Sequence, residues 1–257
     1  MGDKKHGDFA SKAIYGFGEQ GFGKAEELLG KVFADAPEYR DRMVLATKGG
    51  ITPPTPYNSS AEYLTKAIDD SLRRLGTDRI DLWQIHRPDI LTHPQEIART
   101  VENARKAGKI GAFGVSNFTQ AQITALAQFS AIPIVSTQPE LSPLRIDTIE
   151  NGELDQAILM DLAVLAWSPL GGGRIGEPSN AREQKVAAAL SGVAEAHGVS
   201  RTAAAYSWIM AHPARPIPIV GSQNAARITE AADAFKIQWT RADWYNVLVA
   251  ARGVPLP

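Results

Sequence analysis

Short apolar segments rich in β-branched residues alternate along this chain with longer segments of helical periodicity. Most of the short segments are apolar at consecutive positions, as in strands that are covered on both faces. They are Met43–Thr47, Ile80–Ile85, Ile110–Val115, Ile134–Thr137, Ala163–Ala166 and Ile217–Val220. Such alternation is typical of βα units joined into a parallel sheet. It predicts an α/β fold with helices on the faces of the sheet.

The helical segments carry recognisable start and stop signals. Ser60 precedes one of them as an N-cap, and Gly76 follows it as a residue suited to the left-handed conformation. The predicted helices are Gly23–Ala34, Ser60–Leu75, Pro94–Ala107, Thr119–Phe129, Gln184–His197, Ser200–Ala211, Asn224–Phe235 and Thr240–Arg252.

Composition excludes several classes of protein. With 257 residues, 44% of them apolar, the chain can bury a core and is not intrinsically disordered. It has no cysteine, which excludes disulfides, thiol catalysis and Cys-ligated metals. The 27 basic and 28 acidic residues give a net charge of -1, so we expect neither a nucleic-acid nor a membrane partner. A polar N-terminus without an apolar run makes a cytoplasmic location the default expectation.

Polar residues follow nearly every predicted strand. In a barrel of parallel strands, binding and catalytic residues gather at the carboxyl ends of the strands. Lys48, His86 and Gln138 each follow such an end, as do the pairs Ser116-Asn117 and Trp167-Ser168. Singly, each has an ordinary structural explanation, such as a solvated lysine or a helix cap. Together on one rim they predict a binding site.

Several motifs, in this order, resemble the aldo-keto reductase family. The first is the run from Ser71 to Leu82, which continues to Ile85-His86-Arg87-Pro88-Asp89. The others are Gly108-Lys109-Ile110, Phe113-Gly114-Val115-Ser116-Asn117-Phe118, Ala166-Trp167-Ser168-Pro169-Leu170-Gly171-Gly172-Gly173 and Pro218-Ile219-Val220-Gly221-Ser222 with Arg227-Ile228. The resemblance runs from about Tyr15 to the C-terminus. It implies a (β/α)8 TIM barrel as one domain over residues 1–257, and a reductase of small aldehydes or ketones.

The resemblance assigns Tyr15 as general acid, Lys48 as its activator and His86 as the group that orients the substrate. The chemistry is coherent, because a carbonyl that receives a hydride also needs a proton at its oxygen. A free tyrosine is a weak acid, and a neighbouring ammonium lowers the pKa of its phenol. A neutral imidazole can hydrogen-bond the carbonyl oxygen.

The resemblance also implies a nicotinamide cofactor, preferably NADP, with NAD as the alternative. Ser116, Asn117 and Gln138 would bind the carboxamide, and Trp167 would stack on the ring. Ser168, Leu170 and Gly172 match the loop beside the pyrophosphate, where small residues allow close approach. Ser222, Gln223 and Arg227 match the segment that binds the adenosine 2′-phosphate. An arginine guanidinium can donate two hydrogen bonds to such a phosphate. None of these residues is assigned to a metal.

The chain departs from the family before Tyr15. Eight strands are expected and six are found, which suggests the loss of the first two strands and of about 20 residues. The family's catalytic aspartate would lie five positions before the tyrosine, where this chain has Ala10. We favour a sequence that lacks a stretch at this point over a natural six-stranded barrel.

Two other functions stay open. The chain could be a non-catalytic nicotinamide-binding regulatory module, which would agree with the missing aspartate. It could also be an aldolase that forms a Schiff base on Lys48. The identity of the carbonyl substrate and the oligomeric state cannot be read from the sequence.

Overall fold

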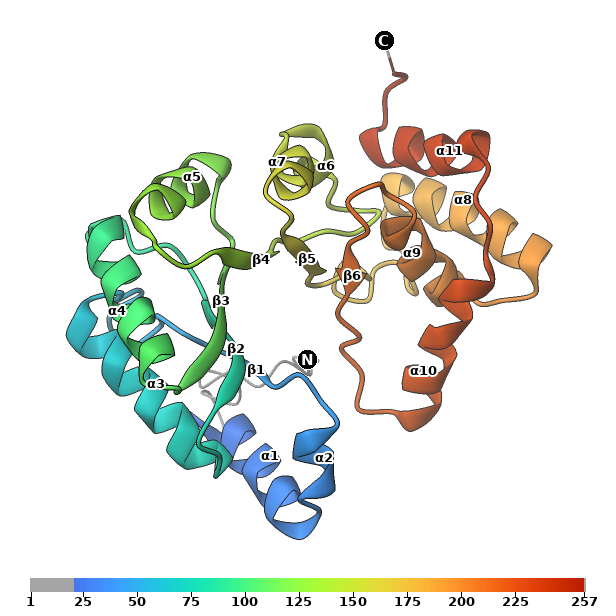
Figure 1. Ribbon diagram of the computed structural model, residues 1–257. Helices are drawn as coiled ribbons and strands as arrows, with labels where there is room; N and C mark the ends of the chain where they lie inside the picture. Colours follow the sequence, from blue (N-terminus) through green and yellow to red (C-terminus); the bar gives the residue numbers. More distant parts are fainter. Residues whose placement is uncertain (1–20, 257) are drawn as a thin grey trace. The chain divides into compact units, whose positions relative to one another are not determined.

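The computed structural model describes residues 21–256 (Figure 1). These residues fall into two compact units, one ending at Thr137 and the other beginning at Gln138. Each unit combines strands with helices packed against them. The α/β class predicted from the alternation is therefore confirmed, and six strands are found among the described residues.

The first unit is built on parallel strands in sequential order. β1 (Ala46–Gly49) pairs with β2 (Ile80–Ile85), which pairs in turn with β3 (Ile110–Ser116). β4 (Ile134–Gln138) follows, with all but its last residue in this unit. The helices of the unit are α1 (Lys24–Asp35), α2 (Glu38–Asp41), α3 (Ala61–Leu75), α4 (Pro94–Lys106) and α5 (Gln120–Phe129). In Figure 1, α3 and α4 lie side by side against the strands, and α1 packs on α3.

Local signals set the ends of these helices. The Ser60 hydroxyl accepts a hydrogen bond from the Tyr63 N–H, and Gly76 closes α3 in the left-handed conformation. α4 begins with Pro94, whose missing N–H costs nothing at that position. Thr119 and Gln122 form a reciprocal capping box at the start of α5. The apolar stripe of α3, with Leu64, Ile68 and Leu75, is fully buried.

The second unit contains β5 (Ala163–Ala166) and β6 (Ile217–Pro218), which are parallel neighbours. Its helices are α6 (Asp147–Glu150), α7 (Glu153–Leu159), α8 (Ala181–His197), α9 (Arg201–Met210), α10 (Ala225–Glu230) and α11 (Arg241–Arg252), with a 3₁₀ helix η1 over Ala231–Lys236. α8 packs against both α9 and α11. The rings of Trp208 and Trp244 stack with centroids 4.9 Å apart. Each indole N–H donates to the other residue's backbone carbonyl across 3.0 Å.

Two of the strand predictions hold at both ends. β2 and β5 have the predicted bounds. The prediction of Met43–Thr47 for β1 is wrong at both ends. Val44 is 78% exposed and lies before the strand, whereas Lys48 and Gly49 continue the pairing with Gln84 and Ile85. Lys48 is therefore part of the strand and does not follow it.

Other boundaries also differ from the predictions. β3 extends to Ser116 and β4 to Gln138, so both polar residues end their strands. β6 has two residues where four were predicted; Pro218 cannot donate to a neighbouring strand. The predicted helix Asn224–Phe235 is an α-helix followed by a 3₁₀ helix.

Three short helices, α2, α6 and α7, were not predicted. The sequence does contain an indication of α7, because a glycine, Gly152, precedes it and the apolar residues Leu154 and Ala157 follow at a helical spacing of three. In the structure Gly152 has φ 85, and both apolar residues are buried.

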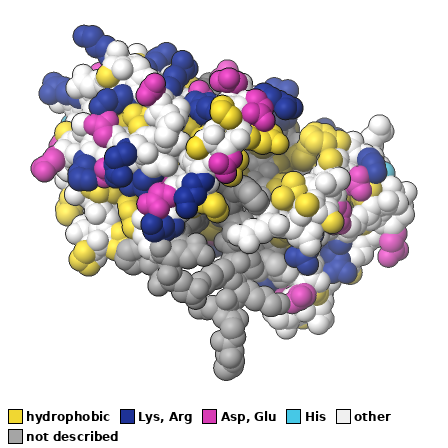
Figure 2. All heavy atoms as spheres, turned by 90° about the horizontal axis from the view of Figure 1, so that it is seen from below, with side chains coloured by type: hydrophobic (Ala, Val, Ile, Leu, Met, Phe, Trp, Pro, Cys, Tyr) yellow, Lys and Arg dark blue, Asp and Glu magenta, His cyan; other side chains and the backbone are white. Residues whose placement is uncertain are grey.

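No helix within residues 21–256 is long and apolar enough to span a bilayer. Figure 2 shows basic and acidic side chains interspersed on the face in view. Tyr15, Ala10 and the predicted loss of two strands before them lie outside the described residues. The interpretation of residues 1–257 as one domain stays a prediction.

Candidate active site

Lys48 lies in β1 on the opposite face from its two neighbours. The Thr47 hydroxyl donates to Glu26 on α1, and a Cβ on Gly49 would meet Trp83 at 2.6 Å and Ala67 on α3 at 3.3 Å. Since side chains alternate along a strand, Lys48 shares a face with its register partner Gln84. The lysine is 3% exposed. Thr47 and Gly49 thus face α1 and α3, and the opposite face of β1 carries the lysine.

The layer of side chains around Lys48 is polar and tightly fitted. Gln84 pairs in register with Gly114, and its amide donates to the Ser136 hydroxyl on β4 across 3.2 Å. A Cβ at Gly114 would lie 2.1 Å from that hydroxyl, so only glycine leaves room for the contact. Gln84, which the sequence analysis did not single out, therefore joins three strands at the level of Lys48. Its position two residues before His86 on the same strand face was the available signal.

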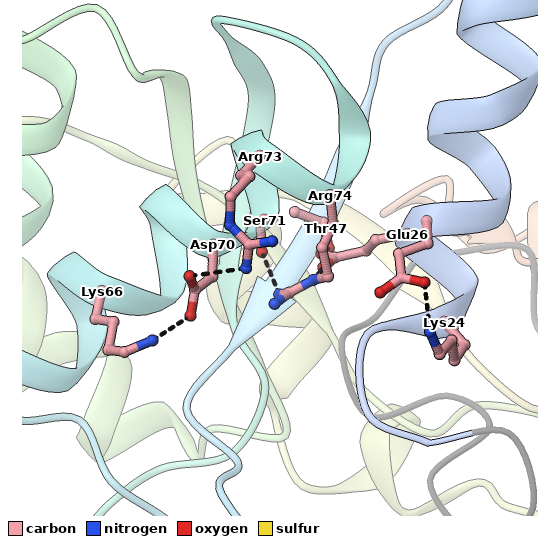
Figure 3. A network of polar contacts seen from close by, with 9 residues as sticks. Lys24, Glu26, Thr47, Lys66, Asp70, Ser71, Arg73 and Arg74 are labelled. Carbon is pink, nitrogen blue, oxygen red and sulfur yellow. Dashed lines mark hydrogen bonds and ion pairs between the residues drawn. The ribbon is translucent and has the colours of Figure 1, made fainter.

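Lys48 and His86 line one cavity of about 330 Å³. Four ionisable side chains of α3 line the same cavity, namely Tyr63, Lys66, Asp70 and Arg74. Figure 3 shows part of this polar network, with Lys66 and Arg73 on either side of Asp70. The structure thus brings together two of the three predicted catalytic residues. The third, Tyr15, lies outside the described residues.

Tyr63 is a neutral donor in this wall. Burial raises the pKa of its phenol above the ordinary value, and hydrogen bonds to neighbouring groups offset only part of that effect. The hydroxyl donates to the backbone carbonyl of Ile51 across 2.8 Å. That bond holds the start of the loop that follows β1.

Ser116, the last residue of β3, and Asn117, which follows it, contact each other. The Asn117 amide nitrogen donates to the Ser116 hydroxyl at 2.9 Å and to the His86 carbonyl at 3.2 Å. Asn117 has φ 60, in the left-handed region that few side chains other than asparagine tolerate. Ser116 is 1% exposed, and the amide of Gln138 is equally buried at the end of β4. These are groups able to hydrogen-bond a carboxamide.

The second unit presents the other predicted cofactor residues in two segments. Trp167 follows β5 and is partly exposed; its N–H donates to the Pro139 carbonyl and its own carbonyl accepts from the Leu141 N–H. Ser168 has φ 54. The Ser168 carbonyl accepts from the Gly171 N–H at 2.8 Å, and the Leu170 carbonyl accepts from the Gly173 N–H at 3.1 Å. Backbone bonds therefore fix this loop.

Three consecutive glycines of this loop adopt left-handed backbone conformations. Gly171, Gly172 and Gly173 all have positive φ, and a Cβ at Gly172 would meet nothing within 4 Å. Space is therefore open beside Gly172, whereas a Cβ at Gly171 would lie 2.9 Å from Cδ1 of Leu144. Arg174 anchors the loop to α8, because its guanidinium donates to both the Gly171 carbonyl and the buried carboxylate of Glu183.

Ser222, Gln223 and Arg227 lie at the start of α10. Asn224 organises this segment, a role that the sequence analysis did not recognise beyond its position before a helix. Its side-chain oxygen accepts from the N–H groups of Ala226 and Arg227, and its own N–H donates to the Ser222 hydroxyl. Arg227 is exposed, which leaves its guanidinium accessible to solvent.

A larger cavity, of about 740 Å³, lies elsewhere in the second unit. His212, Trp239 and Trp244 are among the residues that line it. Burial lowers the pKa of His212, and the nearby charge of Asp155 opposes that effect. This cavity contains none of the predicted site residues, so its size alone is no reason to place the chemistry there.

Comparisons with known proteins identify the family. The model of the Aldo/keto reductase family matches residues 6–248. The chain belongs to this family. It is therefore related to oxidoreductases that act on carbonyl compounds, and the family resemblance inferred from the motifs is confirmed.

Two curated relatives carry the same name. The chain is 64% identical over 245 residues to a 6-dehydroglucose reductase of Novosphingobium aromaticivorans, covering 95% of this chain and 81% of the relative. It is 34% identical over 238 residues to a 6-dehydroglucose reductase of Agrobacterium fabrum, covering 89% and 79%.

The fold is also found among solved structures. A crystal structure of a thermostable aldo-keto reductase superposes with a TM-score of 0.80 over 93% of this chain and 80% of that one, at 23% identity. At this identity the likeness is one of fold. The α/β fold of the TIM-barrel type is thereby confirmed.

Proposed function

We propose that this protein is an NADPH-dependent reductase that converts an aldehyde or ketone to an alcohol. Tyr15 would donate the proton, Lys48 would activate Tyr15, and His86 would orient the carbonyl. The observation that carries the proposal is that Lys48 and His86, from neighbouring parallel strands, line one cavity. The assignment of Tyr15 rests on the family resemblance of the sequence around it.

The chemistry follows from the groups in that cavity. A buried ammonium at Lys48 favours the phenolate of a nearby tyrosine and so makes its proton easier to transfer. A neutral His86 imidazole can donate a hydrogen bond to the carbonyl oxygen and hold the carbonyl in place. The nearly complete burial of Lys48 strengthens its electrostatic effect, because solvent screening is weak there.

NADP is the proposed cofactor, with NAD as the alternative. When bound, the nicotinamide supplies the hydride. Ser116, Asn117 and Gln138 would hydrogen-bond the carboxamide, and the partly exposed ring of Trp167 would stack on the nicotinamide. Ser168, Leu170 and Gly172 would hold the pyrophosphate. The accessible guanidinium of Arg227, with Ser222 and Gln223, supports preference for a 2′-phosphate.

For the substrate we propose a sugar that carries an aldehyde at carbon 6. The support is the name of the relative that is 64% identical to this chain, a 6-dehydroglucose reductase. Reduction adds a hydride to the aldehyde carbon and a proton to its oxygen, and yields a primary alcohol.

The test is to follow NADPH oxidation by the purified protein with 6-dehydroglucose and a panel of other aldehydes and ketones. We expect Tyr15→Phe and Lys48→Met each to lower the reduction rate by at least about 100-fold. Both variants should still quench NADPH fluorescence on binding. Tyr39→Phe and Lys106→Met, at exposed positions on α2 and just inside the end of α4, serve as matched controls. Undiminished reduction by Tyr15→Phe would overturn the mechanism.

The two alternatives give different results in the same experiment. A regulatory module would quench NADPH fluorescence on binding but would not oxidise NADPH with any carbonyl compound in the panel. The alanine at position 10 favours that possibility. An aldolase would become covalently labelled at Lys48 on treatment with borohydride and substrate.

A further inference from the structure

Glu26 is a fully buried carboxylate at the junction of three elements. It projects from α1 and is 0% exposed. One of its oxygens accepts from the Thr47 hydroxyl on β1, and the other accepts from Nε of Arg74 on α3, each across 2.6 Å. Figure 3 shows these three side chains converging. Both carboxylate oxygens therefore have a hydrogen-bonded partner.

The residues around the ion pair of Glu26 and Arg74 leave room for it. Arg74 has a side-chain exposure of only 9%. A Cβ at Gly23 would lie 2.5 Å from Cδ of Arg74, and a Cβ at Gly30 would lie 2.4 Å from the Arg74 carbonyl oxygen. Gly23 at the N-cap of α1 and Gly30 within α1 thus allow the helix to approach Arg74 closely. Because burying an ion pair gives little net stability, such an arrangement suggests a role beyond stability.

The pair is connected to the cavity in two ways. Thr47, which bonds Glu26, is the residue before Lys48, and the two project from opposite faces of β1. Arg74 itself lines the cavity together with Lys48 and His86. One contact can therefore fix the backbone that carries the lysine. The other can compensate a second cation in the wall of the same cavity.

We propose that Glu26 is a positioning residue for the reaction at Lys48. Its bond to Thr47 fixes the carboxyl end of β1, and its ion pair with Arg74 keeps that cation from opposing the charged form of Lys48. The inference rests on the proposed function, in which the Lys48 ammonium acts on the proton donor.

The ion pair predicts opposite shifts in the protonation of Lys48 for substitutions of Glu26 and of Arg74. Among the described residues, the charged and titratable groups that line the cavity with Lys48 are His86 after β2 and Tyr63, Lys66, Asp70 and Arg74 on α3, and Glu26 on α1 contacts Arg74. Glu26→Gln leaves Arg74 uncompensated, which favours the neutral amine of Lys48. Arg74→Gln leaves a negative charge, which favours the ammonium.

The experiment measures kcat and KM against pH for the purified enzyme. In Glu26→Gln we expect kcat to fall about tenfold, with the alkaline limb of the profile moved to lower pH by up to roughly one unit. In Arg74→Gln that limb should move to higher pH, and in the double variant it should return towards the wild-type position. Glu195→Gln and Arg105→Gln are the matched controls, since both residues are exposed on their helices, α8 and α4, and neither lines the cavity.

A second variant separates position from charge and covers the case in which Glu26→Gln does not fold. Thr47→Val removes the hydroxyl without changing any charge. It should lower kcat with the limb unmoved, and Thr47→Ser should restore kcat. A pH profile that is unchanged in both charge variants, together with wild-type kcat in Thr47→Val, would overturn the inference. If Lys48→Met keeps full activity, the proposed function itself is wrong, and this result is distinguishable because it involves none of the three residues.

Discussion

The side-chain amide of Asn117 donates to the backbone carbonyl of His86 across 3.2 Å, which ties the residue after β3 to the residue after β2. The same amide reaches the Ser116 hydroxyl, and the bonds form with Asn117 in the left-handed conformation. Two predicted cofactor residues and one predicted catalytic residue are thus joined at one edge of the first unit. Left-handed conformations at residues other than glycine are common at functional sites.

Substitutions at Asn117 should separate backbone strain from the lost hydrogen bonds. Asn117→Gly loses the amide bonds but adopts φ 60 freely, at a cost of about 1 kcal/mol in the free energy of unfolding. Asn117→Ala should cost about 1 kcal/mol more, because alanine is strained there. Urea unfolding measures both. Equal stability of the two variants would contradict the strain.

Two helical glycines should respond in opposite ways to the same change. Gly30→Ala places a Cβ 2.4 Å from the backbone oxygen of Arg74 and should destabilise the protein by about 1–3 kcal/mol. Gly192→Ala, in α8, meets no atom within 4 Å and should stabilise it by about 0.5–1 kcal/mol. Thermal and urea unfolding of both variants provide the comparison. Stabilisation by Gly30→Ala would show that α1 does not approach α3 this closely.

The reciprocal tryptophan pair should behave as a coupled unit. Trp208→Phe and Trp244→Phe each remove one indole N–H and leave the partner's carbonyl without that donor. The two single losses should therefore sum to more than the loss in the double variant, with a coupling energy of about 0.5–1.5 kcal/mol. A double-mutant cycle in urea measures it. Simple additivity would mean that the two bonds are independent.

Asp81 should contribute stability that depends on pH. Burial by itself would raise the pKa of Asp81, but hydrogen bonds from the Leu45 N–H and from Arg40 outweigh it and hold the pKa below the ordinary value. The ionised form is therefore favoured by folding, and its contribution is present at neutral pH and lost as the pH falls through the lowered pKa.

We expect Asp81→Asn to cost about 1 kcal/mol at pH 7 and progressively less below about pH 4. Asp78→Asn, at an exposed position three residues earlier, is the control. The free energy of unfolding is measured across that pH range. A cost for Asp81→Asn that does not change with pH would contradict the lowered pKa.

Segments rich in apolar residues made part of the fold predictable. Ile80–Ile85 and Ala163–Ala166 have the bounds that their apolar residues predict, although Asp81 and Gln84 interrupt the first. At β1 the pattern misled, because Val44 is apolar but exposed, while Lys48 and Gly49 are a charged residue and a glycine inside the strand. There, hydrogen bonding to β2 decides the boundary, and a linear pattern does not contain that information.

Some residues of the candidate site could be predicted from the sequence, and others could not. Lys48 and His86 could be predicted to meet, because parallel strands place their ends at one edge. Glu26 and Arg74 could not, since they are separated by 48 positions and look like ordinary charged helix residues. Their burial depends on how α1 packs on α3, which is a property of tertiary structure.

The opposite orientation of Thr47 and Lys48 on β1 limits how this chain can vary in length. A single residue inserted or deleted between Leu45 and Lys48 would exchange the two faces, turning the ammonium towards Glu26 on α1 and the hydroxyl towards the face that carries Gln84. Insertions in the loop between β1 and α3 carry no such penalty, because they leave the alternation untouched. Natural and engineered variants of this protein should therefore differ in that loop while the spacing between Leu45 and Lys48 stays constant.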